Sequence, residues 1–302
     1  MHPARSRRVR RWYFLVLTLT LTLLVVLRFT VFRPDDGAQY YVVAVAGIVD
    51  NLIASVAVAL VIGLAWVLLY DDDLQDGVQQ VASRDIPDVL AAAAQGTREW
   101  RVRSRTANYF TKATLPLLAN SALRSGRSVA IRARILDPEN VALLETYARF
   151  RSNHSGSAAR WNPDKVRREV YAAILLLAAY ANEARRLDID VYLSSDFWVV
   201  SVDIADDMAL TTGQNKGDAA LRLDNSTQFY EDMREDFDAS LTQCRRVSPQ
   251  LRGLTPEAIR GVLAASEIGA IREMYVAIGL STLSDAYIKE IVDALGEDHH
   301  YA

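Results

Sequence analysis

The stretch Val199–Asn215, VVSVDIADDMALTTGQN, predicts two short strands joined by a tight turn. In its first half, apolar side chains recur at every second position, which is the period of a half-buried strand. The pair Asp206-Asp207 then interrupts the pattern, and aspartates favour turns because their carboxylates bond nearby backbone N–H groups. A second run of strand-forming residues follows in MALTT. The stretch therefore predicts a β-hairpin.

The segments before this hairpin alternate between strand and helix patterns. Strands are predicted in EWRVRSRT (99–106), in VAIRARIL (129–136), which Asp137-Pro138 stops, and in DIDVYLSS (188–195). Between the last two strands, residues 164–187 contain VYAAILLLAAYA. These twelve uncharged residues are too few to cross a membrane. They predict a helix buried beneath a sheet.

The segment after the hairpin predicts an amphipathic helix. Phe229, Met233, Phe237 and Leu241 recur at helical spacing, so we expect these side chains to face the core. Further helices are predicted from TPEA and SDAYIKEIVDAL near the end of the chain. Strands that alternate with helices, together with one hairpin, predict an α/β sandwich.

The N-terminal seventy residues have the pattern of two transmembrane helices. RSRRVRR places five arginines directly before an apolar run, Trp12–Phe32, which is about long enough to cross ~30 Å of hydrocarbon. A second apolar segment, Tyr40–Tyr70, carries Asp50 as its single charge. A secretory signal peptide fits less well, because the run is longer than a usual signal core and a second span follows at once. The positive-inside rule then places both termini in the cytoplasm.

The sequence thus predicts an α/β protein in which a two-helix transmembrane hairpin precedes a soluble domain. The expected parts are a basic tail (1–11), two transmembrane helices (12–70), a linker with a short helix (71–97), the α/β domain (98–247) and C-terminal helices (248–302). Frequent alanine and arginine favour a bacterial source, so the expected location is the inner membrane, with the lipid bilayer as a partner.

Two charges lie within the predicted hairpin, Arg28 and Asp50. Counted from the cytoplasmic ends of the two spans, both fall toward the outer leaflet at similar depth. We expect them to pair across the hairpin or to reach toward the interface. The alternative is an ion or proton pathway, which would need further polar residues along one face. Apart from Asn51 and Ser55 the second span has none.

Charge and cysteine content narrow the class of protein. The first seventy residues carry seven arginines and three aspartates, whereas the remainder carries 27 basic and 34 acidic residues. An acidic soluble part argues against nonspecific binding of nucleic acid. Cys244 is the only cysteine, so no disulfide can form within one chain, which fits a reducing compartment.

The order of elements resembles one repeat of the phospholipase D superfamily, and most closely the degenerate phospholipase D-like domains of bacterial regulatory proteins. The features that carry the resemblance are a strand ending in ILDP, two helices, a strand, the hairpin SVDIADDMALTTG and a helix rich in Phe and acidic residues, over 99–247. Two such repeats normally face each other and this chain shows one. The resemblance therefore implies a homodimer.

The catalytic residues of that superfamily are missing at the matching positions. Its motif is His-x-Lys-x4-Asp, in which His attacks phosphorus and Lys holds the phosphate oxygens. When the family's aspartate is placed on Asp206, Val199 stands in place of His and Ser201 in place of Lys. Valine can neither attack nor leave as a nucleophile. The resemblance therefore implies a pseudoenzyme without phospholipase activity.

The hairpin turn and the loop that follows it offer two groups of candidate binding residues. Asp206 and Asp207 could hold a ligand hydroxyl or a metal, or could simply form the turn. Gln214, Asn215 and Lys216 lie in a loop that could cradle an anion, but TTGQNKGD matches no phosphate-loop pattern, which favours a solvated loop.

A third group lies at the end of the strand 129–136. Arg132 and Arg134 share one strand face, close to Asp137, and could bind phosphate. Ion pairs with acids such as Glu139 and Glu145 are the alternative. No metal or cofactor is expected. His154 has no Cys or second His nearby with which it could ligate a metal, and it is expected to be a surface histidine.

Three functions from different classes remain open at this point. The first is a noncatalytic membrane-anchored sensor or effector that binds a phosphate-bearing small molecule or a protein partner. The second is a metal-dependent enzyme acting on phosphodiesters or nucleotides through Asp137, Asp206 and Asp207. The third is a scaffold that assembles partners or copies of itself. The missing His and Lys weigh against the second, and the arginine and loop groups favour the first.

Overall fold

The computed structural model describes residues 7–31, 40–69, 77–154, 161–183, 186–213, 215, 217–251 and 253–296. The chain divides into two compact units, Met1–Asp73 and Leu74–Ala302. His299, His300 and the loop around residues 155–160 lie outside the described residues, as do Gln214 and Lys216.

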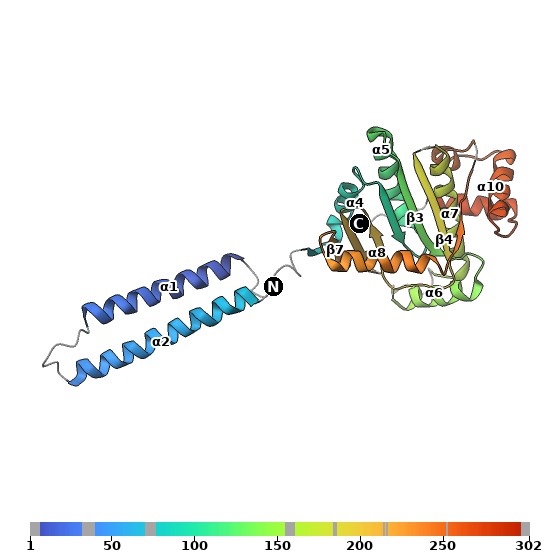
Figure 1. Cartoon of the computed structure of the whole chain (residues 1–302). Coiled ribbons are helices and arrows are strands. Elements are labelled where there is room, and N and C mark those ends of the chain that lie inside the picture. The colour runs from blue at the N-terminus through green and yellow to red at the C-terminus, as the bar shows by residue number, and fades with distance from the viewer. Residues whose placement is uncertain are drawn as a thin grey trace. The chain divides into compact units, whose positions relative to one another are not determined.

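The first unit contains two long helices that pack side by side, α1 (Arg7–Thr30) and α2 (Tyr40–Leu69) (Figure 1). Arg28 of α1 donates from Nε to Oδ1 of Asp50 in α2 at 2.7 Å. Among the described residues, the segment Val45–Gly63 of α2 is long and apolar enough to cross a membrane, whereas the apolar part of α1, Phe14–Thr30, is shorter. One helix, and not the expected two, therefore meets both criteria of length and composition.

The second unit is built on an eight-stranded sheet in the order β1-β7-β6-β5-β2-β3-β4-β8. Only β2, β3 and β4 run parallel to one another, and every other neighbouring pair is antiparallel. The strands are β1 (Val78–Val81), β2 (Glu99–Arg103), β3 (Val129–Leu136), β4 (Leu187–Ser194), β5 (Ser201–Ile204), β6 (Met208–Thr212), β7 (Ala220–Asp224) and β8 (Arg245–Val247).

Helices cover both faces of this sheet (Figure 1). One face packs against the larger core, to which most helices contribute. They are α4 (Ile86–Ala93), a π-helical turn (Phe110–Thr114) that runs into α5 (Leu115–Ser125), α6 (Val141–His154), α7 (Pro163–Glu183), α9 (Pro256–Ile259), α10 (Ala265–Ala277) and α11 (Asp285–Leu295). The other face carries a smaller core beneath α8 (Gln228–Leu241).

The helix α7 lies buried against the sheet, as its sequence predicts. Its residues from Val170 to Tyr180 are all buried, and Glu169 just before them is buried as well. Because the sheet lies on one side and α6, α9 and α11 pack on others, an apolar surface around the whole helix is satisfied within the domain. This explains why so apolar a segment need not enter a membrane.

The helix α8 covers the opposite face, with one residue placed differently from the expectation. Phe237 and Leu241 are buried and Met233 is partly buried, but Phe229 is 56% exposed. Tyr230 is buried in its place and donates its hydroxyl to the carbonyl of Ala205 at 2.7 Å. The helix begins only at Gln228, so Phe229 lies in its first turn, where the contacting face is set by the N-cap rather than by the spacing.

The expected boundaries of the α/β domain are too narrow. The expected linker contains the edge strand β1, which pairs with β7, and neither strand was predicted. The C-terminal helices α9, α10 and α11 share the larger core with α7 and do not form a separate layer. Edge strands and late helices bury only part of their surface, so their local patterns are weak.

The N-cap of α8 provides a first testable prediction. Thr227 accepts a hydrogen bond from the backbone N–H of Tyr230 at 3.2 Å and donates to the carbonyl of Asp224 at 2.8 Å. Thr227→Ala should lower the free energy of unfolding by about 1 kcal/mol. Thermal unfolding followed by circular dichroism would measure it, with Thr146→Ala on the exposed face of α6 as the control. Equal effects of the two substitutions would contradict the capping role.

Candidate functional site

The predicted hairpin is present, and Asp206 fastens its turn to the neighbouring strand. Strands β5 and β6 pair antiparallel from Ser201↔Thr212 to Ile204↔Ala209. The carboxylate of Asp206 accepts hydrogen bonds from the backbone N–H groups of Arg98 at 2.7 Å and Glu99 at 3.1 Å. Both of its oxygens are therefore engaged at the amino end of β2, which gives Asp206 a structural role in the turn.

Asp137 lies at the opposite end of the parallel strands. It follows β3, and its Oδ1 accepts from the backbone N–H of Glu139 at 2.9 Å while its Oδ2 faces Arg245 at 3.4 Å. Since β2 and β3 are parallel and β3 has eight residues, Asp137 and Asp206 are separated by roughly 25 Å. The alternative hypothesis, in which Asp137, Asp206 and Asp207 share one metal site, is therefore wrong. Within the described ranges, no group of three or more His, Cys, Asp or Glu residues could hold a metal ion.

The loop after β6 is occupied by an acid of its own. Asn215 is exposed, and its backbone N–H donates to Oδ2 of Asp218 at 3.3 Å. A carboxylate that accepts from this N–H competes with an anion for the same donor. Gln214 and Lys216, the other two residues of the predicted anion cradle, fall outside the described part of the chain.

Arg132 and Arg134 both point toward the α8 side of the sheet, but they have separate acidic partners. Arg132 donates to Oδ1 of Asp238 at 3.2 Å. Arg134 donates to Oγ of Ser194 at 3.0 Å and to Oδ1 of Asp196 at 2.7 Å. Ion pairs are therefore present, but with other acids than the expected Glu139 or Glu145. Glu139 instead accepts hydrogen bonds from the hydroxyls of Tyr171 and Ser281.

The face beneath α8 is lined by arginines from two adjacent strands. In the parallel register Arg101 lies beside Arg132 and Arg103 beside Arg134. Acidic residues of α8 compensate this positive charge, and Asp238 accepts hydrogen bonds from both Arg101 and Arg132. Asp236 likewise bonds to Arg103 at 2.8 Å. The charges of this surface are thus largely compensated within the fold.

Arg134 lies in a cluster of side chains at the carboxyl end of β2 and β3. We call it the carboxyl-end cluster, and its members are Arg103, Arg105, Arg134, Ser194, Asp196 and Trp198. Arg134 is only 5% exposed, and its guanidinium carbon lies 4.5 Å from the ring centre of Trp198. Arg105 is also buried and donates to the carbonyl of Val199 at 2.8 Å. Two buried cations and an indole therefore meet where the parallel strands end.

Within the described part of the chain, three buried donors of this cluster have no hydrogen-bond partner. They are Nε of Arg103, Nε of Arg134 and Nε1 of Trp198. A buried donor without an acceptor costs about 1–3 kcal/mol. Donors on guanidinium groups bind anions most strongly, because the hydrogen bond is assisted by charge. The cluster is therefore a candidate anion site.

The positions that the resemblance assigns to His and Lys border the same cluster. Val199 is 52% exposed and precedes β5, and Ser201 is the first residue of that strand. Arg105 bonds to Val199, and Arg103 pairs with Val202 in the sheet, so both positions lie at this end. The positive charge comes from arginines of β2 and β3, and the cluster contains no His, Lys or Cys as a nucleophile.

Sequence reasoning found Arg134 but missed Arg103, Arg105 and Trp198. A signal was available, because arginines occupy every second position in EWRVRSRT and Trp198 directly precedes Val199. What the pattern could not supply was that strand β2 lies between β3 and β5, which brings Arg105 to Val199.

Comparisons with known proteins add a distant structural likeness. No protein-family model matches the chain, and no curated protein matches it. Among solved structures, the chain is similar to a phospholipase D family member, Nuc from Salmonella typhimurium, with 17% sequence identity and a TM-score of 0.35. The similarity covers 56% of this chain and 96% of that chain. It is too distant to place the chain in that family.

Proposed function

We propose that the protein is a noncatalytic, membrane-anchored sensor or effector whose α/β domain binds a phosphate-bearing ligand at the carboxyl-end cluster. The observation that carries this proposal is the buried guanidinium of Arg134, whose Nε donor has no acceptor although it lies beside two further unpartnered donors. Phosphate oxygens are acceptors that match a guanidinium in charge and geometry.

The local charge balance supports an anionic ligand. Asp196 is the acidic partner of Arg134 in the cluster, and its side chain is 68% exposed. Burial acts to raise the pKa of Asp196, but its bond to Ser194 and the charge of Arg134 outweigh that effect and lower the pKa, so the carboxylate is ionised at neutral pH. Because this carboxylate is mostly exposed, it can turn into solvent when a stronger acceptor competes for Arg134. A ligand phosphate can then take its place on Arg134.

The absence of the superfamily's His and Lys at the matching positions supports a binding function over phospholipase-type catalysis. Phosphoryl transfer of the phospholipase D type needs a group that attacks phosphorus and later leaves. Val199 and Ser201 occupy the matching positions, and neither can act as the His and Lys do in that superfamily. The degenerate character of the domain is part of this proposal.

The helical unit supports the membrane anchor. Large apolar side chains are exposed along both helices, among them Leu19 and Leu23 of α1 and Val61 and Ile62 of α2. Such a surface requires a cover, which a bilayer provides. The hydroxyls of Thr20, Thr22 and Thr30 in α1 and Ser55 in α2 donate to carbonyls one turn earlier, as they would need to do in lipid. We propose two passes with both termini in the cytoplasm of a bacterial inner membrane.

Ligand binding can be tested by thermal shift on the full chain in detergent micelles. Inorganic phosphate, adenosine 5′-monophosphate and glycerol 3-phosphate are the probes, and a bound probe should raise the melting temperature with concentration. Arg134→Gln should weaken binding about ten- to a hundredfold, because it removes a charge-assisted contact of about 1.5–3 kcal/mol.

The matched control is Arg127→Gln, because Arg127 is exposed near the amino end of β3, away from the cluster. Its affinity should equal that of the unsubstituted protein. Equal losses in both variants would show a nonspecific charge effect and would contradict the proposed site. No shift with any probe would favour the scaffold. The homodimer stays a prediction, which light scattering in detergent would check.

A further inference from the structure

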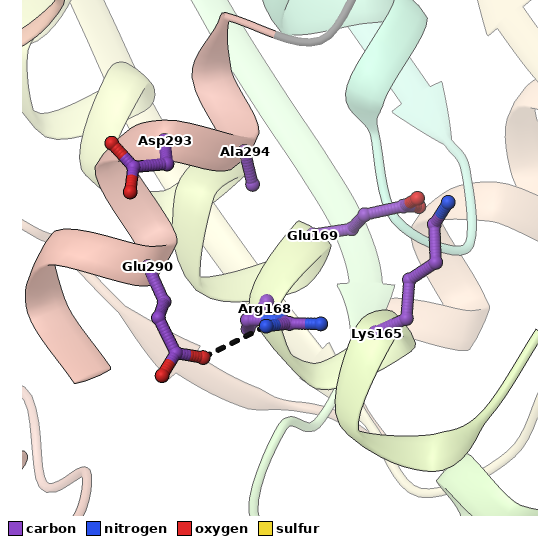
Figure 2. A pocket seen from close by; sticks show the side chains of 6 residues that line it. All are labelled: Lys165, Arg168, Glu169, Glu290, Asp293 and Ala294. Carbon is purple, nitrogen blue, oxygen red and sulfur yellow. Dashed lines mark hydrogen bonds and ion pairs between the residues drawn. The ribbon is translucent and has the colours of Figure 1, made fainter. Parts of the chain in front are cut away.

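Charged side chains between two helices of the α/β unit compensate one another. They line a small cavity of about 190 Å³ between α7 and α11, where Arg168 of α7 donates to Glu290 of α11 at 2.8 Å (Figure 2). In the same view Lys165 and Glu169, both of α7, turn their charged ends toward one another. These four charges are therefore occupied within the fold.

The helical unit contains a polar side chain in a different situation, Asn51 of α2. Asn51 is exposed, and its side-chain amide makes no hydrogen bond to any described residue. The hydroxyls of Thr20, Thr22 and Ser55 differ from it, because each donates to a carbonyl one turn earlier in its own helix. An amide has two N–H donors and an acceptor oxygen, and leaving them unpaired in hydrocarbon is costly. Asn51 therefore requires a partner in a bilayer.

The depth of Asn51 keeps its amide away from water. The segment of α2 that is long and apolar enough to cross a membrane begins at Val45, and Asn51 lies six residues later, about 9 Å along the helix. Lysine and arginine reach the interface from such a depth through their long stems. Asparagine has a single methylene group and cannot do so, so the partner must itself lie within the membrane.

Asn51 also points away from the other helix of its own hairpin. Ala46 and Val49 are buried on the side of α2 that packs beside α1. At 3.6 residues per turn, Asn51 lies about 140° around the helix from Ala46 and about 200° from Val49. The opposite face of α2 therefore carries the amide, and α1 cannot be its partner.

A second copy of the hairpin would supply a partner at the right depth. Two copies that cross the bilayer in the same direction place their Asn51 side chains at the same level. Because a primary amide both donates and accepts, two such side chains can bond to each other reciprocally. Arg28 and Asp50 pair within one hairpin at 2.7 Å, so the approach of a second copy brings no unpaired charges together.

Gly47 lies one turn before Asn51 on the same exposed side of α2. A Cβ added at Gly47 would meet no atom within 4 Å, so the packing of the hairpin itself does not require glycine there. A neighbouring helix that approaches closely does benefit from it, because small residues let two backbones come together in a membrane.

We propose that the protein forms a parallel homodimer within the membrane, in which two α2 helices pack along the face of Gly47, Asn51 and Ser55 and the Asn51 amides bond to each other. This inference rests on the membrane anchor of the proposed function. It depends neither on the phosphate site nor on the likeness to phospholipase D.

Sedimentation equilibrium of the full chain in detergent micelles tests the role of the amide. Asn51→Leu keeps a similar size and should weaken self-association about five- to thirtyfold, the equivalent of about 1–2 kcal/mol. Asn51→Gln keeps the amide and should retain most of the affinity. Thr20→Val removes a hydroxyl that already bonds within α1 and should change nothing. A monomeric unsubstituted protein, or equal affinities of Asn51→Leu and Thr20→Val, would overturn the proposal.

Disulfide cross-linking of the full chain in phosphatidylcholine vesicles locates the interface. With Cys244→Ser removing the native thiol, Ser55→Cys should link two copies on oxidation, because Ser55 lies one turn after Asn51 on the exposed face. Val49→Cys is the matched control, because Val49 is buried within the hairpin and should link few copies. Linking through Val49→Cys as strong as through Ser55→Cys would contradict the assigned face.

Extraction of the same vesicles with alkaline carbonate tests the anchor separately. A chain that carbonate releases would contradict the membrane anchor of the proposed function and the dimer with it. A chain that stays in the membrane but forms no cross-links through Ser55→Cys would overturn the dimer alone.

Discussion

Asp203→Asn should gain about 4 kcal/mol of stability relative to the unsubstituted protein as the pH rises from 4 to 8. Asp203 is buried on β5, and its Oδ1 accepts a hydrogen bond from Nε1 of Trp100 at 3.1 Å. Burial raises the pKa of Asp203 to about 7, although the bond to Trp100 acts in the opposite direction. Asparagine keeps an oxygen for Trp100 and never has to ionise.

The direction of this change in stability with pH follows from how the folded and the unfolded protein bind the proton of Asp203. Below about pH 4 the carboxyl group is protonated in both the folded and the unfolded protein, so it costs nothing. Between about pH 4 and pH 7 the unfolded chain loses this proton while the folded protein retains it, so the free energy of unfolding falls as the pH rises. Each pH unit of this window costs about 1.4 kcal/mol, and the window is about three units wide.

The measurement is the difference in unfolding free energy between Asp203→Asn and the unsubstituted protein, taken in urea at several pH values. Asp207→Asn is the matched control, because Asp207 is exposed in the turn of the same hairpin and should show little effect at any pH. A difference that stays constant from pH 4 to pH 8 would contradict the raised pKa of Asp203.

Asp238→Ala should destabilise the protein by about 2–3 kcal/mol. Asp238 bonds through Oδ1 to Arg101 at 3.1 Å and to Arg132 at 3.2 Å. Arg101 is buried, and among the described residues Glu99 would remain as its only acidic partner. Removing one member of a buried ion pair costs about 3–5 kcal/mol, and the partial exposure of Asp238 reduces that figure.

A double-mutant cycle would isolate this interaction. In an Arg101→Met background the cost of Asp238→Ala should fall by at least half, because the buried charge that needs Asp238 is gone. Asp232 on the same helix accepts a hydrogen bond from the side chain of Gln228, and Asp232→Ala should change stability by less than about 0.5 kcal/mol. An unchanged cost in the Arg101→Met background would show that Asp238 acts through another contact.

The elements that could be predicted from the sequence are those whose burial pattern is complete within one segment. The hairpin of β5 and β6 alternates along its own residues, and α7 is apolar on all sides. The edge strand β1, VQQV, has only its two ends apolar. Such a pattern does not distinguish a strand from a linker, because its burial comes from β7 far along the chain.

The candidate site was predictable only in part, for a related reason. The residue type of Arg134 indicates anion binding, but its partners Asp196 and Trp198 lie on a segment that the topology brings to it. The spacing of Asp137 and Asp206 in the sequence gives no indication that they lie at opposite ends of the central strands. Where the order of strands brings side chains from separate segments together, the contact depends on the fold. The sequence then shows no periodic pattern from which the contact could be predicted.

The pairing of β1 with β7 has a consequence for how the protein is made. Val78 at the start of the domain pairs with Leu223, so the sheet cannot be completed until most of the chain has left the ribosome. Contacts between residues so distant in sequence form slowly. A nascent chain that stops before residue 220 would leave β1 without its partner and β6 as a bare edge, and unpaired edges of this kind recruit chaperones or aggregate. Synthesis beyond β7 is therefore the step that gives β1 its partner and covers the edge of β6.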